Sequence, residues 1–110
     1  MLTEVTIDDL EQARTQGAQL VDVRESDEYA EAHVPGARLM PLAILPARLH
    51  ELSNDSPVYV ICGCGARSAK AAEILTGAGL DARSVAGGMT AWIRSGQPVA
   101  TGVPRDGKEG

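Results

Sequence analysis

The sequence has few aromatic residues and no phenylalanine: its 110 residues include one tryptophan and two tyrosines. A hydrophobic core must therefore be built mainly from Val, Ile, Leu, Ala and Met. Basic residues are also scarce, with 10 Lys and Arg against 15 Asp and Glu and a net charge of −5. No basic stripe offsets this deficit, which argues against a nucleic-acid partner. No apolar run approaches the ~20 residues that cross a bilayer, so we expect no membrane partner either.

Cysteine occurs only twice, at Cys62 and Cys64. A disulfide framework in a small secreted domain needs cysteines spread along the chain, and a structural zinc ion needs four ligands. Neither His33 nor His50 completes such a set, so we expect no metal and no cofactor. The N-terminal segment MLTEVTIDDLEQ carries acids where a secretory signal has bases, and it has no apolar stretch. We therefore expect a cytoplasmic location, with both cysteines as free thiols.

Short apolar runs alternate along the chain with segments of helical spacing. Strands are predicted at 2–5, 19–23, 38–40, 58–61 and 81–85, and helices at 7–14, 27–32, 46–52, 68–76 and 89–95. This alternation predicts an α/β domain, with a parallel or mostly parallel sheet of about five strands and helices on both faces. We place the domain at residues 1–100. Residues 101–110 lack periodicity, and we expect them to form a flexible tail.

Three helix starts carry local signals. The Thr6 hydroxyl is placed to accept from the amide of Asp9, and acids in the first turn favour the positive end of the helix dipole. Ser26 is the predicted cap of the second helix. Pro46 suits the first turn of the third, with Leu45, Leu49 and Leu52 on its buried side.

The segment Val58–Ala72 is the candidate functional site. Cys62 follows a buried strand and faces the start of a helix, at the edge of an α/β sheet where ligands bind. Free amides, a helix dipole and a nearby cation lower the pKa of such a cysteine from ~8.5 into the range ~3.5–7.5. Gly63 and Gly65 let the backbone curl so that its amides point inward, and Arg67 adds a permanent positive charge. We predict a nucleophilic thiolate; the alternative is a small buried core cysteine.

The second cysteine has two interpretations. Cys64 is either a passive loop residue whose amide contributes to the site, or a resolving thiol that closes a disulfide or sulfur bridge with Cys62. We favour the passive role. A C-x-C pair alone is a poor metal site.

Three segments in order resemble the single-domain rhodanese family of sulfurtransferases, over roughly Leu2 to Val99. They are VDVRESDEYAEAHVPGA (Val21–Ala37), the loop CGCGARS (Cys62–Ser68) and GGMTAWIRSG (Gly87–Gly96). The resemblance implies an α/β fold with a five-stranded parallel core. It also implies a sulfurtransferase that takes a sulfane sulfur from a donor, either thiosulfate or a persulfide. The acceptor would be cyanide or a thiol, including the thiol of a small protein.

The resemblance also assigns roles to individual residues. Cys62 would carry the sulfur as a persulfide, and Arg67 would steady it and an incoming anion. The remaining loop residues would supply amides; they are Gly63, Cys64, Gly65, Ala66 and Ser68. Further support would come from Asp22 and Arg24, which we interpret as an internal brace, and from His33, which we expect to bond backbone rather than to assist the chemistry. We expect Tyr29 and Trp92 to lie in the core.

The loop distinguishes sulfur chemistry from phosphate chemistry. Four residues separate Cys62 from Arg67. As the resemblance implies, this length suits a transferable sulfur, whereas phosphatases and arsenate reductases of the same fold carry one residue more. The position after Cys62 is glycine, where many relatives carry a basic side chain, so the loop has one fixed cation. The alternative from another functional class is a redox-sensing or sulfur-carrier interaction module using Cys62 and Cys64.

Overall fold

The computed structural model describes residues 3–103 as a parallel five-stranded sheet with strand order β1-β5-β4-β2-β3. All four strand pairings are parallel. The strands are β1 (Glu4–Val5), β2 (Gln19–Asp22), β3 (Arg38–Leu39), β4 (Val58–Ile61) and β5 (Ala82–Val85). The predicted fold class is therefore confirmed. Leu2, the start of the predicted first strand, lies outside the described residues.

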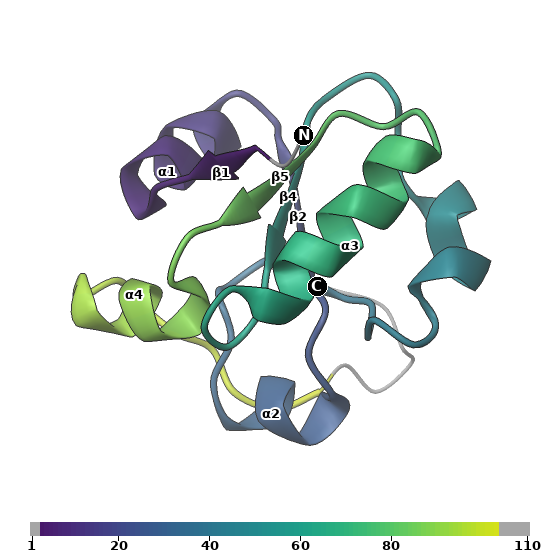
Figure 1. The fold of residues 1–110 in the computed structure, drawn as a ribbon. Coiled ribbons are helices and arrows are strands. Elements are labelled where there is room, and N and C mark those ends of the chain that lie inside the picture. Colours follow the sequence, from purple (N-terminus) through teal and green to yellow (C-terminus); the bar gives the residue numbers. More distant parts are fainter. Residues whose placement is uncertain (1–2, 104–110) are drawn as a thin grey trace.

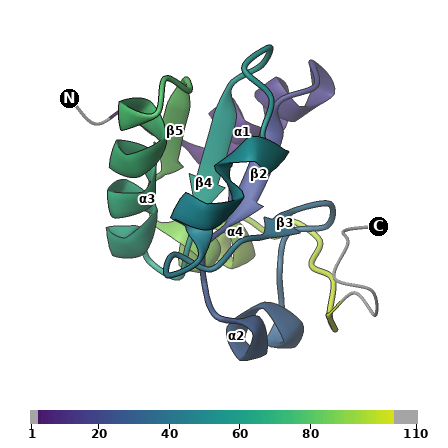
Figure 2. The same ribbon diagram turned by 90° about the vertical axis from the view of Figure 1, so that its right-hand side faces the viewer.

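Helices cover both faces of the sheet (Figure 1). They are α1 (Ile7–Thr15), α2 (Ser26–Glu31), α3 (Ala66–Gly77), α4 (Gly88–Arg94) and the 3₁₀ helix η1 (Leu45–Glu51). Figure 1 shows α1 and α4 on one side of the sheet and α3 on the other. The short helix α2 lies beyond the carboxyl ends of the strands, as Figure 2 also shows from the side. The carboxyl edge of the sheet is thus the place where α2, α3 and α4 converge.

Alternation along the strands sends side chains to two separate cores. In β4, Val58 and Val60 join the cluster under α3 and η1, while Tyr59 and Ile61 join the cluster under α1 and α4. Period-two alternation in a strand covered on both faces produces this division. Trp92 is buried in the second cluster, as the sequence predicts. Tyr29 of α2 is buried in the same cluster, which confirms its predicted place in the core.

The predicted caps are correct for one helix and wrong for another. Thr6 caps α1 as expected: its Oγ1 accepts from the Asp9 amide at 3.1 Å, and the Asp9 carboxylate accepts from the Thr6 amide at 3.0 Å. Ser26 does not cap α2, because it is already the first helical residue and Glu25 takes the N-cap position. The Glu25 amide donates to the Glu28 carboxylate at 2.9 Å, which ties the start of the helix to its own first turn.

Two helices differ from the predicted form. The segment after Pro46 is a 3₁₀ helix with a kink at Arg48, not a regular α-helix, although Leu45 and Leu52 are buried as predicted. Helix α3 starts at Ala66, two residues before the predicted Ser68. Gly65 precedes it with a φ of 119°, a conformation that favours glycine and lets the chain enter the helix directly from the loop. The earlier start brings Arg67 into the first turn.

The chain after α4 returns to α2. The Ala100 and His33 backbones exchange two hydrogen bonds, at 2.8 and 2.9 Å, and the Gly102 amide donates to Ala30 O at 2.8 Å. The rest of the predicted tail, from residue 104, lies outside the described residues. No helix within residues 3–103 has the length and apolar character needed to cross a membrane.

Candidate active site

Cys62 lies immediately after β4 and is 1% exposed. Its backbone is fixed by α4: Cys62 O accepts from the Met89 amide at 2.8 Å, and Gly63 O accepts from the Thr90 amide at 3.1 Å. A side chain at Gly88 would place its Cβ 2.2 Å from Cys62 O, so only glycine permits this approach. The glycine pair at the start of α4 therefore allows the helix N-terminus to hold the base of the loop.

The thiol is surrounded by donors from the loop and from the first turn of α3. The Gly65 amide donates to Cys62 Sγ at 3.0 Å, and the Ser68 hydroxyl lies 3.4 Å from the sulfur. Burial alone would raise the pKa of this thiol. Hydrogen bonds from the Ser68 hydroxyl and from the amides of Ser68, Gly65 and Arg67 outweigh that effect, so the pKa of Cys62 lies below its ordinary value. The site favours a thiolate, the reactive form of cysteine.

A second buried hydroxyl stands behind the first. Ser84 of β5 is fully buried, and its Oγ lies 2.7 Å from Ser68 Oγ. Ser68 Oγ also donates to Gly65 O at 3.0 Å. The sulfur is thus the end of a chain of hydroxyls that reaches from the loop into the sheet.

Arg67 forms a two-pronged ion pair with Glu28 of α2. Arg67 Nη1 donates to Glu28 Oε1 at 2.7 Å, and Arg67 Nη2 donates to Glu28 Oε2 at 2.9 Å. The Arg67 hydrogen bonds, together with the Glu25 amide, lower the pKa of Glu28 to about 2. The same pair raises the pKa of Arg67. The cation of the loop is therefore partnered by a carboxylate from across the carboxyl edge of the sheet.

Asp22 and Arg24, at the end of β2, form a buried ion pair. Arg24 Nη2 donates to Asp22 Oδ2 at 2.8 Å, Arg24 Nε donates to Asp22 Oδ1 at 3.0 Å, and the Arg24 amide also donates to Oδ1 at 3.0 Å. Arg24 Nη2 further donates to Ala32 O at 2.8 Å, which ties the strand end to the end of α2. None of these bonds involves the Cys62 sulfur. The pair instead holds the C-terminal end of α2 against the end of β2.

His33 follows the same C-terminal end of α2 and is buried. Its Nδ1 is 2.7 Å from Tyr29 O, and its ring stacks on the Tyr29 ring with centroids 3.6 Å apart. Burial lowers the pKa of the imidazole, which favours the neutral ring. The hydrogen bonds of His33 join it to Tyr29 of α2 and to Ala100. Its surroundings are those of a structural residue.

The remaining loop residues face outward to different degrees. Cys64 and Ala66 are exposed, while Gly63 and Gly65 are half-buried. Both cysteines are free thiols. Within residues 3–103 no group of three or more His, Cys, Asp or Glu side chains is placed to hold a metal ion.

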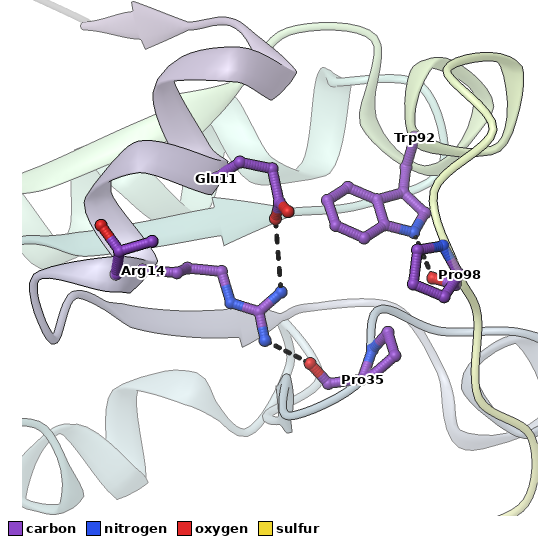
Figure 3. Close-up of a pocket in the computed structure, with 6 residues that line it drawn as sticks. Glu11, Arg14, Pro35, Trp92 and Pro98 are labelled. Atoms are coloured by element: carbon purple, nitrogen blue, oxygen red, sulfur yellow. Dashed lines mark hydrogen bonds and ion pairs between the residues drawn. The ribbon is translucent and has the colours of Figure 1, made fainter.

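A separate pocket is lined by residues of α1, α4 and the segments at Pro35 and Pro98 (Figure 3). This groove of roughly 400 Å³ is lined by Glu11, Arg14, Thr15, Pro35, Trp92 and Pro98. Its polar groups are bound to one another: Arg14 donates to Pro35 O and pairs with Glu11 at 3.7 Å, and Trp92 Nε1 donates to Pro98 O at 2.8 Å. It contains no residue of the cysteine loop, so we do not assign the reaction to it.

Sequence reasoning missed two residues of the site, Glu28 and Ser84. Glu28 contacts a residue 39 positions away, and nothing local in the sequence indicates that contact. Ser84 carried a weak signal, because it is a small polar residue in the buried strand segment ARSV. Its partner is 16 positions distant.

Comparison with known proteins gives consistent matches over most of the chain. The model of the rhodanese-like domain matches residues 6–95. A sulfurtransferase of Allochromatium vinosum is 34% identical over 102 residues, which cover 90% of this chain and 95% of that protein. The thiosulfate sulfurtransferase GlpE of Actinobacillus pleuropneumoniae serotype 3 is 37% identical over 87 residues, covering 78% of this chain and 81% of that protein.

A solved structure shows the same fold. The crystal structure of a rhodanese-related protein from Thermoplasma volcanium superposes with a TM-score of 0.84 at 31% sequence identity, covering 91% of this chain and 99% of that one. Other relatives are longer, and the matched region is between 38% and 60% of their length. The domain therefore occurs both alone and within larger proteins.

Proposed function

The chain belongs to the rhodanese-like family, and from that premise we propose that it transfers a sulfane sulfur through a persulfide on Cys62. The observation that carries the proposal is the environment of Cys62 Sγ, a buried sulfur with a lowered pKa that accepts from the Gly65 amide at 3.0 Å. A thiolate held by amides is suited to attack an electrophilic sulfur and then to carry the anionic adduct.

In the loading step the Cys62 thiolate attacks the outer sulfur of a donor. With thiosulfate, a bond forms between Cys62 Sγ and the sulfane sulfur, and the bond from that sulfur to the sulfonate sulfur breaks. Its electron pair leaves with sulfite. With a thiol persulfide, the sulfur–sulfur bond of the donor breaks in the same way and a thiolate leaves. The Ser68 hydroxyl and the loop amides hold the charge near Cys62 before and after the transfer.

In the unloading step an acceptor attacks the outer sulfur of the persulfide. Cyanide gives thiocyanate, and a thiol gives a new persulfide. In both cases the electron pair of the sulfur–sulfur bond returns to Cys62 Sγ as a thiolate, so the enzyme is regenerated without a redox cofactor. The low pKa of Cys62 makes this thiolate a good leaving group.

The test is sulfur loading of the intact protein followed by mass spectrometry. Incubation with excess thiosulfate or glutathione persulfide is expected to add the mass of one sulfur atom, which cyanide then removes as thiocyanate. We expect Cys62→Ser to abolish loading and turnover, and Cys64→Ser to retain both. Sulfur transfer that persists in Cys62→Ser would refute the proposal.

A second experiment, on the same protein, separates this function from the redox-sensor alternative. Mild oxidation followed by thiol titration is expected to leave no intramolecular Cys62–Cys64 disulfide. A bridge that forms readily, in a protein that does not accept sulfur, would favour the sensor. Aryl phosphate hydrolysis that depends on Cys62 would favour a phosphatase.

A further inference from the structure

The cation of the cysteine loop is neutralised by a residue from outside the loop. Arg67 is the only Lys or Arg between Cys62 and Ser68. Both of its terminal nitrogens donate to the two carboxylate oxygens of Glu28, at 2.7 and 2.9 Å. This fork-to-fork geometry is the one in which a guanidinium binds an oxyanion most specifically. Any oxyanion that bound Arg67 in this way would compete with Glu28.

Glu28 is itself held in place. The Glu25 amide donates to Glu28 Oε1 at 2.9 Å, so the carboxylate also closes the first turn of α2. The end of that helix is tied to β2 through Arg24 and Ala32 O. With a pKa of about 2, Glu28 keeps its negative charge throughout the physiological pH range. A sulfur donor that approaches the Arg67 guanidinium therefore also meets the negative charge of the Glu28 carboxylate.

Arg24, a second arginine near this edge, does not supply a compensating charge. Arg24 is 6% exposed, and its side chain is bound to Asp22 and to Ala32 O. The two arginines, Arg24 and Arg67, are therefore each matched by one carboxylate, Asp22 and Glu28. The loop offers backbone amides and hydroxyls to the sulfur but little net positive charge.

Two classes of sulfur donor differ in the charge next to the transferred atom. Thiosulfate is a dianion whose charge is shared between the sulfane sulfur and the sulfonate-type group bonded directly to it. A thiol persulfide carries at most one negative charge on the transferred sulfur, the neighbouring thiol sulfur is uncharged, and any carboxylates lie several bonds away. Because charge repulsion scales with the product of the charges, the Glu28 carboxylate disfavours the first class more than the second.

We infer that Glu28 determines donor specificity at this site, by occupying Arg67 and disfavouring thiosulfate, and that the donor class it favours is a thiol persulfide. This inference rests on the proposed sulfur transfer through Cys62. It makes Glu28 of α2 a specificity residue that acts through its charge and its pairing with Arg67.

The experiment compares two donors in the same enzyme preparations. Steady-state kcat/KM is measured with thiosulfate and with glutathione persulfide, each with cyanide as acceptor, for the wild type and Glu28→Gln. The substitution keeps the side-chain shape and an oxygen acceptor for the Glu25 amide. We expect kcat/KM for thiosulfate to rise about fivefold, the effect of removing one nearby charge in a solvated site, and the value for glutathione persulfide to change less than about twofold. The ratio of the two values does not depend on the fraction of folded protein.

Glu31→Gln is the matched control, because it removes one negative charge from the same helix at an exposed position, and Glu31 forms no ion pair with any residue between 3 and 103. Its donor ratio is expected to equal that of the wild type. Glu28→Ala, which removes the acceptor as well as the charge, is expected to shift the ratio in the same direction as Glu28→Gln.

An unchanged donor ratio in both Glu28 variants, a shift toward the persulfide, or an equal shift in Glu31→Gln would overturn the inference while leaving the proposed function intact. The proposed function fails separately, and the inference with it, when the wild type accepts sulfur from neither donor.

Discussion

The stability of a thiolate at Cys62 depends on the direction in which the Ser68 and Ser84 hydroxyl groups donate their protons. Ser68 Oγ donates its one proton to Gly65 O at 3.0 Å and accepts from the neutral Cys62 thiol at 3.4 Å. When Cys62 is ionised, the sulfur becomes a second acceptor for the Ser68 proton. Ser84 is buried, and Ser68 Oγ at 2.7 Å is its hydroxyl partner. When Ser84 donates to Ser68, the Ser68 proton is free to turn to the thiolate. Ser84 thereby supports Ser68 in stabilising the charged sulfur.

This arrangement predicts a graded effect on the Cys62 thiol. In a Cys64→Ser background, where Cys62 is the one remaining cysteine, we expect Ser68→Ala to raise the pKa of Cys62 and to slow alkylation by iodoacetamide at pH 7 about tenfold. A hydrogen bond to a charged group contributes about 1.5–3 kcal/mol, which is the basis for this magnitude. Ser84→Ala should raise the pKa by less. The measurement is the alkylation rate against pH.

A further variant, Ser84→Thr, separates the effect of the Ser84 hydroxyl on the Cys62 pKa from the effect of its packing in the sheet. Ser84→Thr retains the hydroxyl, so it should retain the pH midpoint of the wild type if the backbone of β5 accepts the extra methyl group. An unchanged midpoint in both Ser68→Ala and Ser84→Ala would mean that the loop amides alone hold the thiolate.

At the scale of elements, two ion pairs hold α2 at the carboxyl edge of the sheet. Arg24 of the Asp22–Arg24 pair donates to Ala32 O at the end of α2, and Glu28 of α2 pairs with Arg67 of α3. The first is buried, with the Asp22 and Arg24 side chains 0% and 8% exposed, and the second is near the surface, with the Glu28 and Arg67 side chains 37% and 40% exposed. Solvent screens the surface pair, so its contribution to stability is about 1 kcal/mol at most. The short helix thus depends on its ends more than on its own length.

The surface pair predicts a specific acid dependence of stability. Because the pKa of Glu28 falls to about 2 in the folded protein and is ~4.3 in an unfolded chain, the stabilisation is complete above the unfolded value and is lost as pH falls toward the folded value. Glu28→Gln should therefore be about 1 kcal/mol less stable than the wild type at pH 7. The difference should disappear as pH approaches about 2.

Urea unfolding at a series of pH values measures this difference. Other carboxyl groups titrate in both proteins and cancel in the comparison. A stability difference that persists unchanged at the acid end would show that Glu28 contributes through its hydrogen bond to the Glu25 amide, which the glutamine retains in part, rather than through its charge.

At the scale of the whole molecule, the sequence predicts the features that depend on residues close together in the chain. The short apolar runs predict the strands, their alternation with helical segments predicts a parallel sheet covered on both faces, and the strand–glycine–helix pattern predicts the position of Cys62. Contacts between distant segments are not predicted, because the Glu28–Arg67 and Ser68–Ser84 pairs have no local pattern. The predicted cap of α2 is wrong for a related reason. Ser26 is of a residue type that favours the N-cap position, but the Glu28 carboxylate accepts from the Glu25 amide and the helix begins one residue earlier.

The sheet divides the hydrophobic core into two clusters that share no residue. Val58 belongs to the cluster under α3, and Val34 belongs to the cluster under α1 and α4; both are fully buried. Truncation of either valine to alanine should reduce the free energy of unfolding by about 2 kcal/mol. If the two clusters pack independently, the loss in the double variant should equal the sum of the single losses within ~0.5 kcal/mol.

Urea denaturation of the wild type, both single variants and the double variant tests this additivity. A coupling larger than ~1 kcal/mol would mean that repacking on one face is transmitted through the sheet to the other. That result would have a functional consequence, because Cys62 is packed in the same cluster as Val58, whereas Trp92 of α4, the helix whose amides hold the base of the loop, is packed with Val34. Independent clusters would instead allow either side of the site to change without disturbing the other.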